Sequence, residues 1–202
     1  MNKKEEKFFS LLMEDGDLCH TGGQVLGAAL QNPEIREDAF QKAKGIWRTR
    51  REQKSHIRGQ LEKLWSGEQR ITAGLLIETT ENILLLEESF GRLLALGEGQ
   101  PPEAMETSME LVLLGLEELK KIFAYSRTLQ ENYMKAEARH QKIANYEARN
   151  SAVVLQGLKR IYMGDQMMPN VFWKDGFEIT NEILEETLEA ASLFQQLMED
   201  HL

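Results

Sequence analysis

The chain has 202 residues, of which 42% are hydrophobic and 28% are charged, a composition that excludes a disordered protein and suffices to build a core. The formal net charge of −9 argues against nucleic acid or an anionic membrane as the partner. The single cysteine, Cys19, cannot form an internal disulfide, which fits a reducing compartment, and we expect a cytoplasmic protein.

Three long helices are predicted in the first half, because leucine, glutamate and alanine are abundant and prolines are few. The first covers 4–30 and ends at Pro33, since the residue before a proline is pushed out of the α region. The second covers 34–65 and ends before Gly67, and the third covers 71–96. Apolar residues recur in each at spacings of three and four, as in a helix with one buried face.

A break at 97–103, with the sequence GEGQPPE, separates the two halves. The second half is predicted to contain a helix over 105–129, a turn near 129–133 and a further helix up to a linker at 164–170. The last helix is predicted over 172–198. No helix breaker marks the turn, which is placed by comparison with the first half.

The two halves match each other when 46–68 is shifted by 97 positions onto 143–165. Ile57 then meets Val154 and Trp65 meets Tyr162, while the third helices of the halves align with a shift of 104. A match of this length at a fixed shift indicates an internal duplication.

We therefore predict an all-α fold, a six-helix antiparallel bundle made of two three-helix repeats in one domain, 1–202. Repeat one is 1–97, the linker is 98–103 and repeat two is 104–202. The longest apolar runs are far shorter than the roughly 20 residues that a membrane span needs, so we expect no direct membrane insertion.

Motifs of catalysis are missing from the sequence: it has no HExxH, CxxC, GxSxG or phosphate-binding loop, so we predict a protein that is not an enzyme, with no catalytic residues. Glu137 and His140 form a Glu-x-x-His pair of the kind found in di-iron bundles. Such a site needs a second pair and two further glutamates, so a solvated helix face is the alternative interpretation.

The two halves differ in charge at matching positions. Arg50 and Lys54 in the first half correspond to Glu147 and Ser151 in the second. If these positions face the interior, the second half gathers three carboxylates that could start an oxygen-rich cation site. These carboxylates are Glu147, Glu185 and Glu189. The alternative is a solvated acidic face made of the glutamates between 182 and 189.

For the first half we expect a different arrangement. Arg50 and Lys54 would neutralise Glu81 and Glu88 across a helix interface and so take the place of a metal ion. The basic stretch 42–63 around them is either a patch for an anion or a partner, or a solvated face that pairs with acids elsewhere.

Five segments carry a pattern beyond helix periodicity: KFFSLLMEDGD at 7–17, IWRTRREQKSHIRGQLEKLW at 46–65, ENILLLEESFGRLLAL at 81–96, IANYEARNSAVVLQGLKRIY at 143–162 and ILEETLEAASLFQQLMED at 183–200. In order and spacing they resemble the PhoU-like family of phosphate-transport regulators, in particular the two-repeat branch associated with phosphate transporters. The resemblance implies two three-helix repeats, with metal clusters held by Glu-x-x-x-Asp pairs on the second and third helices of each.

The chain departs from that family pattern. Arg50 and Lys54 replace the carboxylates of repeat one, and their third-helix partners are Glu81 and Leu85. Repeat two keeps acids at 147, 185 and 189 but has serine at 151. The resemblance thus implies no certain cofactor, and at most a divalent or ferric ion in repeat two.

The function that the resemblance implies is a non-enzymatic regulator or accessory protein of phosphate transport. It would act by contact with a membrane phosphate transporter or its signalling partner, as a homo-oligomer at the inner face of the membrane. The alternatives are a metal-binding bundle with ferritin-like or di-iron chemistry and a helical scaffold unrelated to phosphate.

Overall fold

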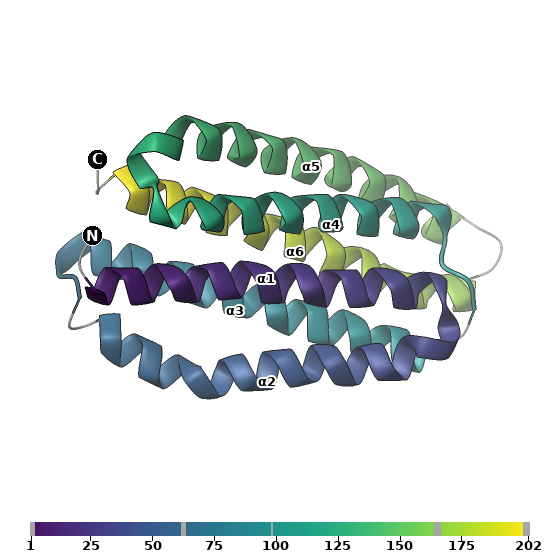
Figure 1. The fold of residues 1–202 in the computed structure, drawn as a ribbon. Helices are drawn as coiled ribbons and strands as arrows, with labels where there is room; N and C mark the ends of the chain where they lie inside the picture. Colours follow the sequence, from purple (N-terminus) through teal and green to yellow (C-terminus); the bar gives the residue numbers. More distant parts are fainter. Residues whose placement is uncertain (1–2, 62–63, 98, 164–166, 200–202) are drawn as a thin grey trace.

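The computed structural model describes residues 3–61, 64–97, 99–163 and 167–199, and within these it is all-helical, with no β-strand, which confirms the predicted all-α class (Figure 1). The helices are α1 (Lys3–Gln31), α2 (Arg36–Leu61), α3 (Gly67–Leu96), α4 (Glu103–Ala124), α5 (Leu129–Met163) and α6 (Met167–Glu199). Short 3-10 turns occupy Pro33–Ile35 and Tyr125–Arg127.

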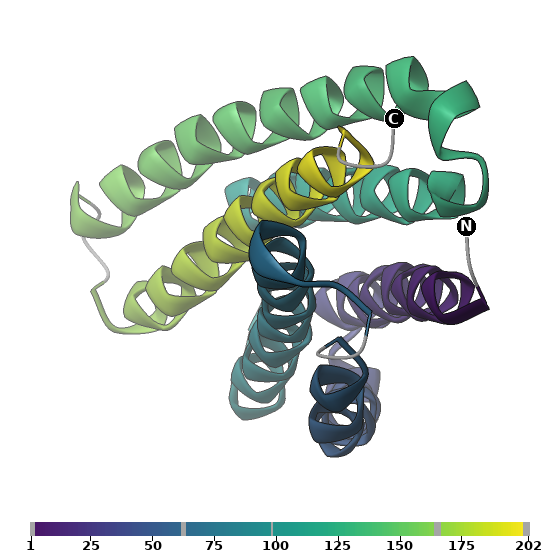
Figure 2. The same cartoon turned by 90° about the vertical axis from the view of Figure 1, so that its left-hand side faces the viewer.

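The six helices form two layers. Helices α2, α3, α6 and α5 lie in that order, each packed on the next, while α1 packs on α2 and α3 and α4 packs on α5 and α6. Figure 2 shows α1 and α4 on the right and the outer side of α3 and α6 on the left. The two sets of three helices meet through α1 with α4 and α3 with α6.

Aromatic rings join the two sets at one end of the bundle. Phe194 of α6 lies 6.4 Å from Phe9 of α1 and 5.3 Å from Phe123 of α4, measured between ring centroids. All three rings are fully buried, so this cluster closes the interface between the sets with large apolar surfaces, edge-on between Phe9 and Phe194 and tilted between Phe123 and Phe194.

Helix boundaries mostly agree with the sequence prediction, with two corrections. The turn predicted at 129–133 is wrong, because α4 ends at Ala124 and α5 already begins at Leu129. Thr128 makes the earlier break stable: its carbonyl accepts a hydrogen bond from the backbone N–H of Asn132, and its hydroxyl accepts one from the Asn132 side chain at 2.5 Å.

The linker predicted at 164–170 is also shorter than expected. Helix α6 begins at Met167, so Pro169 lies in its first turn, where a backbone N–H has no helical partner to lose. Residues 164–166 of that predicted linker lie outside the described residues.

Arg36 ties the connection between the two halves to the end of α1. Its buried guanidinium donates to the carbonyl oxygens of Gly97 (2.9 Å) and Gly99 (3.0 Å), and also to those of Ala29 and Leu30. Because the last carbonyls of a helix have no partner within it, this one side chain satisfies α1 and fixes the segment before α4.

Among the described residues, no helix has an apolar stretch long enough to cross a membrane.

Candidate functional site

Arg50 lies in the interior, as the sequence predicted, but its partner is a different carboxylate. Its guanidinium Nη2 donates to Asp15 Oδ2 of α1 at 2.6 Å, and the two side chains are 3% and 0% exposed. The predicted pairing of Arg50 with Glu81 and Glu88 is therefore not what the fold brings together. Glu88 instead accepts from Arg92, one turn along the same helix, at 2.5 Å.

The remaining members of that predicted set are Glu81 and Lys54. Glu81 is buried on α3, at 8% exposure. The side chain of Lys54 lies outside the described residues, so its predicted role as a substitute for a metal charge stays a prediction.

Asp15 stands in an unusual environment for a carboxylate. Burial raises the pKa of Asp15 to about 7, although the charge of Arg50 and a hydrogen bond from Thr80 act in the opposite direction. The Thr80 hydroxyl lies 3.4 Å from Oδ2, and Oδ1 has no hydrogen-bond partner among the described residues. The desolvation of a fully enclosed carboxylate thus outweighs one ion pair.

The second half holds a neutral counterpart of this group. The Ser108 hydroxyl of α4 donates to Asn150 Oδ1 of α5 at 2.7 Å and lies 2.8 Å from Thr180 Oγ1 of α6. All three residues are 0% exposed. We call the first-half group (Asp15, Arg50, Thr80) the charged triad and the second-half group (Ser108, Asn150, Thr180) the neutral triad.

Two members of the triads, and the buried positions around them, recur at a spacing of 100. Arg50 and Asn150 are 100 positions apart, as are Thr80 and Thr180, and the buried residues Ala43 and Ile57 recur as buried residues at 143 and 157. A shift of 100 rather than 97 thus relates the burial of α2 to that of α5. Glu147 then corresponds to Trp47 and not to Arg50.

The carboxylates predicted as a metal site lie on α5 and α6, and two of them are linked. The Ser151 hydroxyl lies 3.0 Å from Glu147 Oε1 and 3.2 Å from Asn181 Oδ1, and the Asn181 amide donates to Glu185 Oε1 at 2.6 Å. Glu147 and Glu185 therefore approach one another through two neutral side chains rather than directly.

Glu189, the third predicted ligand, lies in a neighbouring groove of about 360 Å³ on α6, which we call the acidic groove. It is lined by Glu182, Glu185, Glu186 and Glu189. Burial raises the pKa of Glu186, the surrounding carboxylates add to the effect, and a hydrogen bond from Asn82 opposes it. Within the described part of the chain, no three or more acidic, histidine or cysteine side chains converge closely enough to hold a metal ion.

Glu87 is a buried group that the sequence did not single out. Its carboxyl is 1% exposed, and it packs over Gly22 and Gly23 of α1, where a Cβ at Gly22 would overlap Oε2. Burial raises the pKa of Glu87 well above its usual range, and a hydrogen bond from the Gly23 backbone opposes the shift. The adjacent glycines Gly22 and Gly23 make room for this glutamate. The sequence does not reveal the pairing, because it depends on how α1 and α3 pack together.

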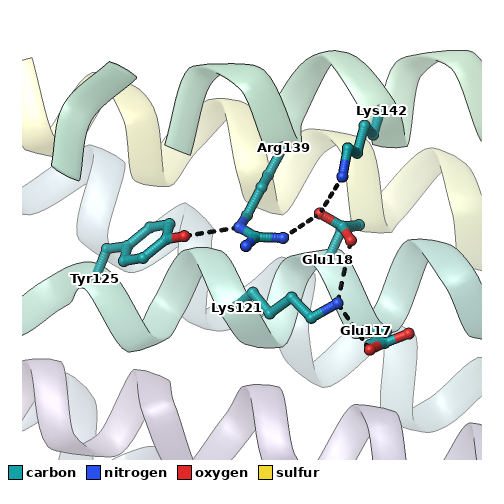
Figure 3. A network of polar contacts seen from close by, with 6 residues as sticks. All are labelled: Glu117, Glu118, Lys121, Tyr125, Arg139 and Lys142. Carbon is teal, nitrogen blue, oxygen red and sulfur yellow. Dashed lines mark hydrogen bonds and ion pairs between the residues drawn. The ribbon is translucent and has the colours of Figure 1, made fainter. Parts of the chain in front are cut away.

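A second polar network joins α4 to α5 near the surface (Figure 3). Arg139 donates to Glu118 Oε2 at 2.6 Å and to the Tyr125 hydroxyl at 2.8 Å, and Lys121 reaches Glu118 Oε1 at 3.2 Å. Burial would raise the pKa of Glu118, but the hydrogen bonds from Arg139 and Lys121 hold it below its usual range. This network ties α4 to α5 beside the turn between them.

Neither a protein-family model nor a curated protein matches this chain.

Proposed function

We propose that this protein is a two-repeat helical regulator of phosphate transport that acts by protein–protein contact and not as an enzyme. It would bind a membrane phosphate transporter or the signalling partner of one, on the cytoplasmic side. The chain resembles the PhoU-like family in the order of five segments along its length, and that family has this architecture and role.

The observation that carries the proposal is the correspondence between the charged triad and the neutral triad. In each, one residue comes from the first, second and third helix of a half, and the residues from the second and third helices keep the same spacing of 100. Such a correspondence supports a duplicated three-helix unit, with repeat one in 1–97 and repeat two in 104–202.

The experiment is a comparison of phosphate uptake in source cells that have and lack the gene, together with affinity purification of the tagged protein from their solubilised membranes. We expect uptake to change in the deletion strain and a phosphate transporter or its signalling partner to be enriched with the tagged protein. Unchanged uptake across phosphate concentrations, with no such enrichment, would contradict the proposal and favour a scaffold unrelated to phosphate.

A second candidate function is cation binding in the second half, which the chain of hydrogen bonds from Glu147 to Glu185 supports. Carboxylate oxygens beside serine and asparagine oxygens suit a hard cation. Titration with Mn²⁺ and Fe³⁺ by calorimetry, with metal analysis of the purified protein, tests it. Glu147→Gln with Glu185→Gln should abolish binding, whereas Glu178→Gln, on α6 like Glu185, should not.

Two tightly held iron ions per chain in the same metal analysis would instead support the di-iron alternative. Metal-free protein that gives no binding heat with either ion would contradict both forms of this second candidate.

A further inference from the structure

The last turns of α5 carry exposed apolar side chains on the outer side of the bundle. Leu155, Tyr162 and Met163 are 69%, 62% and 75% exposed. Helix α5 packs on α4 and α6, and Figure 2 shows its last turns, in lighter green, at the edge of the molecule away from α1. Within the described part of the chain these three side chains are therefore uncovered, which favours contact with another apolar surface.

Cations lie among and beside these apolar side chains. Tyr162 and Met163 are consecutive, so they stand about 100° apart around the helix axis, and Leu155 and Lys159 lie within the arc between them. Arg160 is exposed beyond one border of the arc. We call these five residues the α5 patch.

The local charge of this part of α5 is opposite to that of the whole protein. Residues 148–163 hold three cations and no carboxylate, although the chain has a net charge of −9. The cations are Arg149, Lys159 and Arg160, and among the described residues none of them forms an ion pair. Their charge is therefore not offset at short range, and a negatively charged surface can approach them.

The fold itself does not require this arrangement. With the shift of 100 that relates the burial of α2 to that of α5, positions 155, 159 and 162 correspond to Ser55, Gly59 and Glu62. The first half thus has neither an apolar side chain nor a cation at these positions, yet it forms the same kind of three-helix set. Binding therefore explains the α5 patch better than packing does.

We infer that the α5 patch binds the surface of a membrane that contains anionic lipids. Leu155, Tyr162 and Met163 enter the boundary between headgroups and acyl chains, the depth at which tyrosine is enriched in membrane proteins. Lys159 and Arg160 reach the lipid phosphates, because their long apolar stems let the charge stay among the headgroups. Helix α5 then lies on the membrane without crossing it.

A lipid surface suits this patch better than a protein partner does. The patch mixes apolar and charged side chains on one convex side of a helix, and its leucine, methionine, lysine and arginine side chains are flexible. A fluid bilayer adapts to such a surface, whereas the core of a protein interface depends on shape complementarity and is depleted in lysine. This contact goes beyond the proposed contact with a transporter and does not depend on it.

The test is co-flotation of the full chain with vesicles of phosphatidylcholine, with and without phosphatidylglycerol. The wild type should bind the anionic vesicles, less tightly as salt is raised, and the neutral vesicles about tenfold or more weakly. Lys159→Glu with Arg160→Glu should weaken binding to anionic vesicles by about tenfold or more, because two attractions become repulsions. Leu155→Ser with Met163→Ser should weaken it by about tenfold, because less apolar surface is buried.

Two matched variants change other surfaces. Lys42→Glu with Arg48→Glu makes the same change of charge at exposed positions on α2. Leu114→Ser with Met134→Ser removes the same two residue types, at 40% and 71% exposure. Both should bind anionic vesicles nearly as the wild type does, because screening limits the effect of distant charges. Circular dichroism checks that each variant is folded.

A wild type that does not bind anionic vesicles at low salt would overturn the inference. So would a charge control that loses as much binding as Lys159→Glu with Arg160→Glu, since net charge and not the α5 patch would then govern binding. Unchanged binding of Leu155→Ser with Met163→Ser would overturn the apolar contact with the lipid. The two patch variants are independent, so if one misfolds the other remains the test. Vesicles contain no transporter, so failure here is distinct from failure of the proposed function.

Discussion

The charged triad and the neutral triad occupy corresponding places in the two halves, yet they meet the demands of burial in different ways. In the neutral triad, the Ser108 hydroxyl contacts Asn150 Oδ1 and Thr180 Oγ1, and Thr180 also donates to the backbone, all without net charge. In the charged triad, Arg50 compensates Asp15 through one short contact and leaves Asp15 Oδ1 without a partner among the described residues. The comparison teaches that one helical frame accepts either chemistry, but only the charged version makes the interior dependent on protonation.

The largest effect is expected from breaking the charged triad. Arg50→Ala should lower the free energy of unfolding by about 3–5 kcal/mol at a pH where Asp15 is ionised, because a buried charge loses its partner. Asn150→Ala, the equivalent change in the neutral triad, should lower it by about 1–2 kcal/mol. Urea denaturation followed by circular dichroism measures both.

A double substitution sharpens the same comparison. Asp15→Ser with Arg50→Asn copies the neutral triad into the first half and should recover most of the stability that Arg50→Ala loses. If the double variant is as unstable as Arg50→Ala, the two triads are not equivalent and the correspondence between the halves is weakened.

The next effect concerns the glycines at which helices approach each other. Gly22→Ala forces a Cβ against the Glu87 carboxyl and should lower the free energy of unfolding by about 2–3 kcal/mol. Gly115→Ala in α4 comes within 3 Å only of one Leu184 methyl group, an apolar atom at the end of a flexible side chain, so about 1 kcal/mol is expected. Thermal unfolding of the two variants measures both losses of stability. Equal losses would show that the Glu87 side chain moves aside as easily as Leu184 does.

The third expectation is a pH dependence that comes from Asp15 of the charged triad. Asp15 has a folded pKa of about 7, above its unfolded value of 3.8, so its contribution to stability is complete at low pH and is lost as pH rises to about 7. The free energy of unfolding should therefore fall by about 1 kcal/mol between about pH 6 and pH 7 on account of this group.

The variant Asp15→Asn isolates the contribution of Asp15 to this pH dependence. The difference in unfolding free energy between the wild type and Asp15→Asn should vary over this pH range and level off above it. Glu87, whose pKa is also raised, is present in both proteins and cancels in the difference. A difference that stays constant with pH would show that Asp15 remains ionised and that Arg50 outweighs burial.

The smallest effect is expected at the network of Figure 3. Arg139→Ala should cost about 1 kcal/mol or less, because Arg139 is partly exposed and Lys121 still binds Glu118. The loss should shrink further at high salt, whereas the loss from Arg50→Ala should not, since buried charges are poorly screened. Urea denaturation at low and high salt compares the two.

The sequence alone determined the helical class and the approximate helix boundaries. These follow from local rules: apolar spacing of three and four, a proline after α1 and glycines between helices. These local rules did not predict the turn between α4 and α5, since Thr128 and Asn132 form it without a glycine or a proline.

Only the tertiary structure decided which side chains meet. A helix repeats its apolar stripe every three to four residues, so a shift of 97 matches almost as many apolar positions as a shift of 100. Buried polar groups remove that ambiguity, because Arg50, Asn150 and the two threonines must each find a partner. Asp15 is the partner of Arg50 from 35 residues away, and no local pattern encodes a contact between separate helices.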